Sequence, residues 1–223
     1  MKKIKNMIAR LVKAGCRRIG KILYRIRARY EDWRLGRVSV DKKKESKFEE
    51  VGANAMESTN YQWLDQMFKA YPVDKNGSFV DVGCGEGRVL TYLYLRGFRG
   101  TMTGIELDED NAKIATQRTK TCKNIQILQK NVLDCPDTIG QATAVYLFNP
   151  FNELVMERFI ELMEKVCKQP VVVYYCCDKY RQLLDKRKGW TILRRNLLYS
   201  PGRPARPYTI YGYMPETQEE KSV

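Results

Sequence analysis

The sequence predicts an α/β fold with a mostly parallel seven-stranded sheet that ends in an antiparallel hairpin. Three observations predict it: short apolar runs alternate with amphipathic stretches, a glycine-rich turn follows the first run, and two β-rich runs close the chain with no helix between them. Such alternation is typical of a parallel sheet that helices cover on both faces. The 223 residues suit one domain of this kind with an appendage.

The predicted elements follow one another at short intervals. We expect strands at residues 79–82, 101–106, 125–129, 144–148, 171–175, 191–199 and 208–214. We expect helices at residues 61–71, 88–95, 108–119, 153–166 and 179–186. Ser58, Thr59 or Asn60 supplies an N-cap for the first of these helices. The Pro- and Gly-containing turn at residues 200–206 lets the last two strands pair antiparallel.

The first 40 residues form a basic arm. They hold thirteen Lys or Arg residues against Glu31 and Asp32, a balance of +11, whereas the rest of the chain holds 27 basic and 24 acidic residues, a balance of +3. Its apolar residues recur every three or four positions, which predicts one apolar stripe on a cationic helix. The stripe comprises Ile4, Ile8, Val12, Cys16, Ile19, Leu23, Ile26, Tyr30 and Trp33. Gly15 and Gly20 weaken this helix, and we expect a break or kink near them.

Four roles for the arm compete. It lies on an anionic membrane, binds RNA phosphates, pairs with a second copy, or packs on its own domain. The membrane surface is favoured, because the stripe is strongly apolar and ends in Tyr30 and Trp33. The chain then divides into the arm at residues 1–40, a linker at 41–54, the catalytic domain at 55–215 and a polar tail at 216–223. Since the candidate cofactor residues lie beyond position 80, we expect deletion of residues 1–40 to leave cofactor binding intact.

Composition excludes several classes of site. The chain has no histidine, which rules out Ser–His–Asp and Cys–His catalysis. Its seven cysteines form no CxxC pair, which argues against a zinc site or a disulfide framework and for buried reduced thiols. No metal site is expected. No apolar run reaches the length of a membrane span, and charges interrupt the N-terminal apolar stretches, so we expect a cytoplasmic protein with peripheral attachment to the inner face of the membrane.

The glycine-rich turn carries the first chemical signal. In the segment VDVGCGEGR at residues 80–88, an apolar strand ends at Asp81, and glycines follow at every second position before a helix begins. Glycine allows a sharp turn and a close approach of a ligand to the backbone, and a helix N-terminus adds unpaired N–H groups. The nicotinamide fingerprint GxGxxG would have its last glycine at position 88, where this sequence has Arg88. The pattern therefore disfavours a dinucleotide-binding site.

This turn closely resembles the D-x-G-x-G-x-G first motif of class I S-adenosylmethionine-dependent methyltransferases. The resemblance covers about residues 55–215 and extends to uncharacterised bacterial methyltransferases with an N-P-F turn after the fourth strand. It implies a Rossmann-like fold and S-adenosylmethionine as the cofactor. The cofactor-binding residues that it implies in this turn are Asp81, Gly83, Cys84, Gly85 and Gly87.

The ends of the second and third strands add further candidates. Glu106, about 20 residues after the glycine turn, can accept hydrogen bonds from both ribose hydroxyls, with Leu107 beside it. The alternative is an acidic N-cap, a role that Asp108 suits better. Asn131 stands where the family usually has an aspartate on the adenine amino group, and Val132 would offer its backbone N–H to the ring. The alternative is an asparagine that satisfies its own turn.

The fourth strand is followed by Asn149, Pro150 and Phe151. They resemble the N/D-P-P-Y/F/W motif of amino-group methyltransferases, one proline short. The resemblance implies that Asn149 contacts the cofactor side and accepts a hydrogen bond from the attacking amine, and that Phe151 stacks on it. The alternative is a proline turn that closes a strand.

These residues predict methyl transfer from S-adenosylmethionine to an unidentified acceptor, with a nitrogen nucleophile favoured. Transfer from a sulfonium requires mainly positioning and desolvation, which is compatible with the absence of histidine. If a base is needed, Tyr61, Glu57 or a later tyrosine serves, and residues 53–61 are expected to fold as a lid. The alternatives are an inactive S-adenosylmethionine-binding adaptor that acts through its arm on membrane or RNA, and a related fold using another nucleotide.

Overall fold

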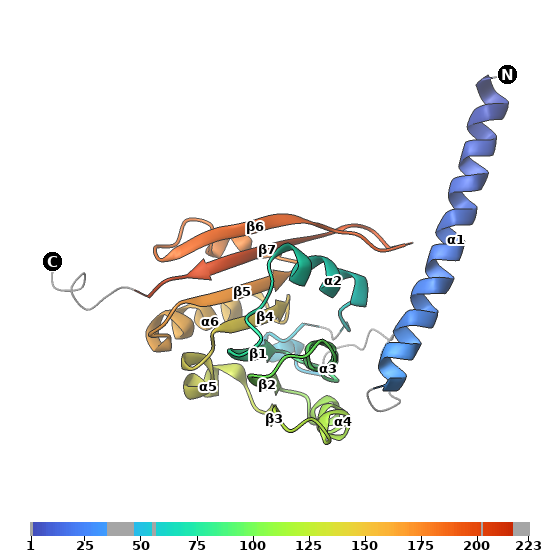
Figure 1. Ribbon diagram of the computed structural model, residues 1–223. Coiled ribbons are helices and arrows are strands. Elements are labelled where there is room, and N and C mark those ends of the chain that lie inside the picture. Colours follow the sequence, from blue (N-terminus) through green and yellow to red (C-terminus); the bar gives the residue numbers. More distant parts are fainter. Residues whose placement is uncertain (1, 35–46, 55–56, 202, 216–223) are drawn as a thin grey trace.

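Seven strands form one sheet in the order β3-β2-β1-β4-β5-β7-β6 (Figure 1). The computed structural model describes residues 2–34, 47–54, 57–201 and 203–215. The strands are β1 (Ser78–Val82), β2 (Thr101–Glu106), β3 (Ile125–Gln129), β4 (Ala144–Phe148), β5 (Val171–Cys176), β6 (Trp190–Leu198) and β7 (Arg206–Tyr213). Strands β1 to β5 are parallel, and β7 runs antiparallel to both β5 and β6. The predicted fold class is confirmed.

The helices are α1 (Lys2–Arg34), α2 (Tyr61–Ala70), α3 (Arg88–Leu95), α4 (Glu109–Thr119), α5 (Pro136–Gly140) and α6 (Glu153–Val166), with short 3-10 turns η1 (Glu49–Val51), η2 (Val132–Asp134) and η3 (Arg181–Leu183). Of these helices, α2, α4 and α6 begin at a side-chain cap. The Asn60 side chain accepts from the backbone N–H of Gln62 at 2.8 Å, and the Asp108 side chain accepts from that of Asn111 at 2.9 Å. Both fill the N-cap role proposed for them.

One predicted helix is wrong. Residues 179–186 form only the turn η3, because polar side chains of this segment bind the hairpin instead of lying on a helix surface. Asp178 accepts from the hydroxyl of Thr209, and Asp185 accepts from the Tyr211 hydroxyl at 2.7 Å. The sequence analysis also missed α5, whose five residues are too few for a periodic signal.

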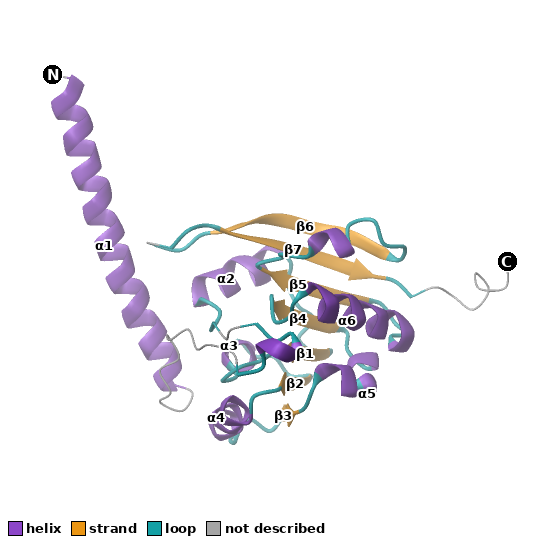
Figure 2. Cartoon of the chain, turned by 180° about the vertical axis from the view of Figure 1, so that it is seen from behind, coloured by secondary structure: helices purple, strands orange, loops and turns teal. Residues whose placement is uncertain are grey.

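Helices cover both faces of the sheet. On β4, Tyr146 packs in a core with α2 and α3, whereas Val145 and Leu147 pack in a second core with α5 and α6. Figure 2 shows the second set of helices from behind. Because β1, β2, β3 and β4 are parallel, their carboxyl ends meet at one edge of the sheet. The loops that carry the predicted site residues therefore converge there.

Helix α1 is continuous and passes through Gly15 and Gly20 without the expected break. Its N-terminal part extends beyond the domain (Figures 1 and 2). A Cβ on Gly20 would lie 3.0 Å from the Cβ of Pro201, so a small residue is needed where the helix passes the β6–β7 turn. Farther along, Tyr24 and Ala28 are buried on the domain. The alternative that the arm packs on its own domain therefore holds for this part of α1.

The polar anchor of α1 is Asp32, which is 4% exposed. Its carboxylate lies 2.9 Å from the guanidinium of Arg88 and 2.7 Å from that of Arg118, and it accepts from the Tyr61 hydroxyl at 2.5 Å. Deleting residues 1–40 would leave two buried arginines without their shared carboxylate. In place of intact cofactor binding, we therefore expect this deletion to destabilise the domain.

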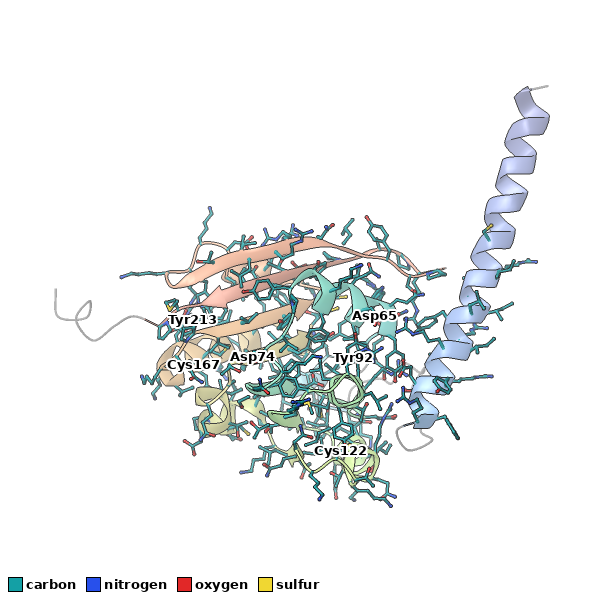
Figure 3. All side chains as sticks on the ribbon, viewed as in Figure 1. Asp65, Asp74, Tyr92, Cys122, Cys167 and Tyr213 are labelled. Carbon is teal, nitrogen blue, oxygen red and sulfur yellow. The ribbon has the colours of Figure 1, made fainter. Side chains whose placement is uncertain are left out.

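A second contact ties α1 to α2. The Arg27 guanidinium lies 2.7 Å from a carboxylate oxygen of Asp65, whose other oxygen accepts from the Tyr92 hydroxyl at 2.9 Å. Figure 3 shows Asp65 and Tyr92 on the side of the domain that faces α1. Arg27 and Asp65 are both about one-third exposed, so this pair contributes less than the Asp32 cluster.

Some of the expected divisions of the chain fall outside the described residues. These are residues 1 and 35–40 of the arm, 41–46 of the linker, 55–56 of the domain and 216–223 of the tail. The rest of the linker is ordered against the domain, with Ala53 paired to Phe151 in an antiparallel bridge. In the described parts no helix is long and apolar enough to cross a membrane. Five of the seven cysteines are buried, Cys177 is half-buried, and Cys16 is exposed, contrary to the expectation for it.

Candidate functional site

Two adjoining cavities open at the carboxyl ends of the parallel strands. The larger has an empty volume of about 750 Å³, which includes space open to solvent. Gly83, Phe148 and Glu57 line both cavities. The predicted residues that line the larger cavity are Gly83, Glu106, Leu107, Asn131, Val132 and Phe151. Those that line the smaller one are Asp81, Gly83, Cys84 and Gly85.

The glycine turn needs its glycines. Gly83, Gly85 and Gly87 have φ angles of +70°, +53° and +78°, in the left-handed region that other residues rarely adopt. A Cβ on Gly83 would also lie 2.9 Å from the Cβ of Pro150, a distance shorter than Cβ atoms adopt in real structures. The turn therefore lies directly against the loop that follows β4. Gly87 lines neither cavity; it precedes α3 as its N-cap.

Glu106 holds the turn in place. One carboxylate oxygen accepts from the backbone N–H of Gly85 at 2.7 Å, and the other accepts from that of Asp108 at 2.9 Å. Each carboxylate oxygen can accept a further hydrogen bond, so the side chain retains acceptor capacity toward the cavity. Burial raises the pKa of Glu106. Since Asp108 is the helix cap, the capping alternative does not apply to Glu106.

Asn131 occupies the position that the sequence indicates but is partly engaged. Its side-chain oxygen accepts from the backbone N–H of Leu133 at 3.0 Å, as the N-cap of η2. This hydrogen bond forms the local turn that is the alternative role of Asn131. The oxygen has a second lone pair, and Asn131 and Val132 both line the larger cavity. Adenine binding by these two residues stays a prediction.

Asp81 presents a buried acceptor to the smaller cavity. Its side chain is 2% exposed, and one carboxylate oxygen has no hydrogen-bond partner among the described residues. Burial, and then the charge of Glu106, hold the pKa of Asp81 well above its usual range. A cationic ligand group would restore the ionised form. Cys84 beside it is a neutral thiol, since burial raises its pKa strongly as well.

The turn after β4 holds Asn149 in a strained conformation. Asn149 has a φ of +42°, and its buried side-chain oxygen has no hydrogen-bond partner in the described structure. Asn149 itself lines neither cavity, but its neighbours Phe148 and Pro150 line the larger one. Phe151 also lines it and packs on Phe159 with ring centroids 5.7 Å apart. The backbone strain and the orphaned oxygen are both typical of a functional turn.

A residue that the sequence analysis missed clamps this turn. The side-chain amide of Asn54 donates to the backbone oxygens of Asn149 at 2.8 Å and of Phe151 at 2.6 Å, and its backbone N–H donates to Pro150 at 2.9 Å. All three turn carbonyls are therefore satisfied by one residue, which leaves the Asn149 side-chain oxygen as the free acceptor. No local pattern reveals such a contact, because the two segments are about 95 positions apart.

The three candidate bases differ in placement. Tyr61 is fully buried and lines neither cavity; its hydroxyl donates to Asp32, and burial raises its pKa. Glu57 lines both cavities but forms an ion pair with Arg203 at 2.9 Å. The later tyrosine at the site is Tyr146, whose hydroxyl lies 3.0 Å from that of Thr59. Burial raises the pKa of Tyr146 strongly. Within the described residues no cluster of three His, Cys, Asp or Glu side chains could hold a metal ion.

Comparisons with known proteins agree with this geometry. Residues 79–169 match the family model of a methyltransferase domain. The chain is similar to the putative methyltransferase yhhF from Escherichia coli, with 18% identity and a TM-score of 0.58, over 71% of this chain and 89% of that one. A comparison with curated proteins found no match.

Two further solved structures share the fold. An RNA methyltransferase from Salinibacter ruber, in complex with S-adenosyl-L-homocysteine, is 22% identical with a TM-score of 0.51, over 72% of this chain and 95% of that one. A segment of StiE O-MT is 11% identical with a TM-score of 0.56, over 73% of this chain and 76% of that one. The chain therefore carries a methyltransferase domain, which residues 79–169 match from β1 through α6, on the Rossmann-like fold that these methyltransferase structures share.

Proposed function

We propose that the chain methylates a nitrogen nucleophile, and that Asn149 is the residue that orients it. The observation that carries this proposal is the Asn149 side-chain oxygen, which is buried, unpaired and held beside the cavity by a strained turn. An unpaired buried acceptor is stabilised by a ligand that brings an N–H group. A donor bound there would direct its lone pair away from Asn149, toward the neighbouring cavity.

The surrounding groups favour nitrogen over oxygen as the nucleophile. A neutral amine attacks with its own lone pair and loses its proton afterwards, whereas a hydroxyl needs a base before or during attack. Glu57 is held by Arg203, and Tyr146 stays protonated because its burial raises its pKa. The amide of Asn149 is an acceptor but no base. The site is therefore suited to position an amine rather than to ionise an alcohol.

We assign the cofactor-binding residues by the acceptors and N–H groups that they present. Glu106 would accept from the ribose hydroxyls, and Asp81 would accept from the ammonium of the methionine part. The turn at residues 83–87 would bring its backbone close to the cofactor, with Asn131 and Val132 at the adenine. When bound, S-adenosylmethionine supplies an electrophilic methyl group on a sulfonium. The chain contributes orientation and exclusion of water.

Replacing Glu106 with alanine should weaken binding of S-adenosylhomocysteine by about 1.5–3 kcal/mol, because the hydroxyls lose a charged acceptor. Isothermal titration measures the change. Glu106→Gln keeps one acceptor oxygen and should lose less. Glu109→Ala is the control, since Glu109 is an exposed acid on α4 paired with Lys113. A loss of only a few tenths of a kcal/mol for Glu106→Ala would show that this carboxylate does not contact the ribose.

Replacing Asn149 with glycine should lower turnover roughly 100-fold while leaving cofactor affinity nearly unchanged, because a displaced nucleophile reacts far more slowly. Glycine is the suitable replacement, since it adopts a φ of +42° without strain. Asn149→Asp retains an acceptor and should restore much of the rate. As a control, Asn124→Ala removes an asparagine that donates to backbone oxygens at the opposite end of the strands. Equal losses of affinity and turnover in Asn149→Gly would mark the turn as structural.

The acceptor is identified by transfer of a labelled methyl group from S-adenosylmethionine into fractionated cell extract. Mass spectrometry of the labelled product then locates the new bond. A methyl group on nitrogen supports the proposal, and a methyl group on oxygen, carbon or sulfur overturns it. Cofactor binding without any transfer would favour the alternative of an inactive adaptor.

A further inference from the structure

Helix α1 has two opposite faces that the structure separates clearly. Tyr24, Ala28, Glu31 and Asp32 are buried on the domain. On the opposite face lie six large apolar side chains that are each 55–61% exposed: Ile19, Ile22, Leu23, Ile26, Tyr30 and Trp33. At about 100° per residue, these six occupy an arc of roughly 100° centred opposite the buried face. We call them the outer face of α1.

The outer face is the main concentration of exposed apolar side chains in the described structure. Fourteen large apolar side chains are exposed in the described structure, and six of them lie within residues 19–33 of α1. Scattered exposed apolar residues are ordinary on a protein surface, but a contiguous apolar stripe marks an interaction site. The domain does not cover this stripe, because the packing contacts of α1 use the other side of the helix.

Basic side chains border the stripe. Arg18, Arg25 and Arg29 are exposed and lie along one edge of it, while Arg34 lies at the other edge, with its guanidinium 5.9 Å from the ring centroid of Tyr30. The arm of residues 1–40 as a whole carries a balance of +11. An apolar stripe bordered by arginines, with three along one edge and one at the other, matches a surface that is apolar beneath and anionic above.

We propose that α1 docks on an anionic membrane surface, with its outer face in the boundary between headgroups and acyl chains. Only a lipid surface offers both an apolar layer for the outer face of α1 and anionic headgroups for the arginines beside it. RNA phosphates would pair with the arginines but leave six apolar side chains in water. A second copy would cover the stripe but bring two strongly cationic arms together. Tyr30 and Trp33, whose rings stack at 6.2 Å, are residue types that favour this boundary.

The proposal is tested by sedimentation of the full chain with vesicles. The protein should pellet with vesicles of phosphatidylglycerol and phosphatidylcholine but not with phosphatidylcholine alone, and added salt should weaken the binding because it screens the charges. Leu23→Gln with Ile26→Gln should reduce partitioning roughly tenfold or more, because two side chains no longer enter the apolar layer. The matched control is Leu154→Gln with Met214→Gln, which changes side chains 59% and 61% exposed elsewhere on the domain and should bind normally.

Tryptophan quenching tests the orientation of the helix. Brominated acyl chains should quench Trp33, which is 59% exposed, but not the buried Trp63. Trp33→Phe should remove the quenching, and Trp190→Phe should retain it. Absence of binding to anionic vesicles at low salt overturns the proposal. So does unchanged binding by the Leu23→Gln and Ile26→Gln variant, which would indicate charge alone and favour RNA. Loss of a dimer in that variant, measured by analytical ultracentrifugation, would identify a second copy as the occupant instead.

Discussion

Replacing Asp32 with alanine is expected to destabilise the protein by about 3–5 kcal/mol, because the change removes the carboxylate that two buried guanidinium groups share. The side chains of Arg88 and Arg118 are 3% and 0% exposed, so water cannot solvate them in place of the carboxylate. The hydroxyl of Tyr61 loses its acceptor as well. Chemical denaturation followed by circular dichroism measures the change in the free energy of unfolding.

The neighbouring acid provides the control for Asp32. Glu31 is also buried, but its partner Arg96 is 3.4 Å away and 32% exposed, so water can replace the lost carboxylate. We expect Glu31→Ala to cost about 1 kcal/mol or less. Similar losses in the two variants would mean that α1 contributes through packing rather than through the Asp32 cluster.

Replacing Gly83 with valine is expected to weaken cofactor binding roughly 100-fold. The new Cβ would clash with Pro150 at 2.9 Å, and a β-branched residue resists a φ of +70°, so the turn must move away from the cavity. Loss of two backbone hydrogen bonds to the ligand would cost about 3 kcal/mol, or roughly 100-fold in Kd. Titration with S-adenosylhomocysteine measures it.

Gly97 separates this effect from backbone strain. It has a φ of +77° but nothing within 4 Å of an added Cβ, and it lies in the turn after α3. Gly97→Val should therefore lose stability and keep cofactor affinity. If the folded Gly83→Val protein binds as tightly as the wild type, the turn is not the cofactor site.

Local signals made most of the fold predictable. The ranges 101–106, 125–129 and 144–148 were predicted with the bounds that β2, β3 and β4 have, because each is a short apolar run between clear turn residues. Strand–helix alternation and the final hairpin then predicted a mostly parallel seven-stranded sheet with an antiparallel end. The glycine turn and Glu106 were recognisable for the same reason, since each stands directly at the end of a strand.

The remaining features depend on contacts between distant positions. The periodic stripe of α1 predicted its apolar face, but not the opposite face, where Asp32 is buried because Arg88 and Arg118 meet it from α3 and α4. Asn54 reaches the turn after β4 from a segment that looks like polar linker. A pattern within one segment carries no information about partners that tertiary structure brings to it.

The Asp32 cluster also constrains how this sequence can change over time. Arg88 and Arg118 are 56 and 86 positions from Asp32, yet one buried carboxylate serves both. A substitution at position 32 alone would remove the carboxylate that both arginines share. A substitution at either arginine would leave the buried carboxylate with less positive charge around it. Homologous chains should therefore keep the three residues as a set or replace them as a set, and relatives that lack the helical arm should carry uncharged residues at the positions of both arginines.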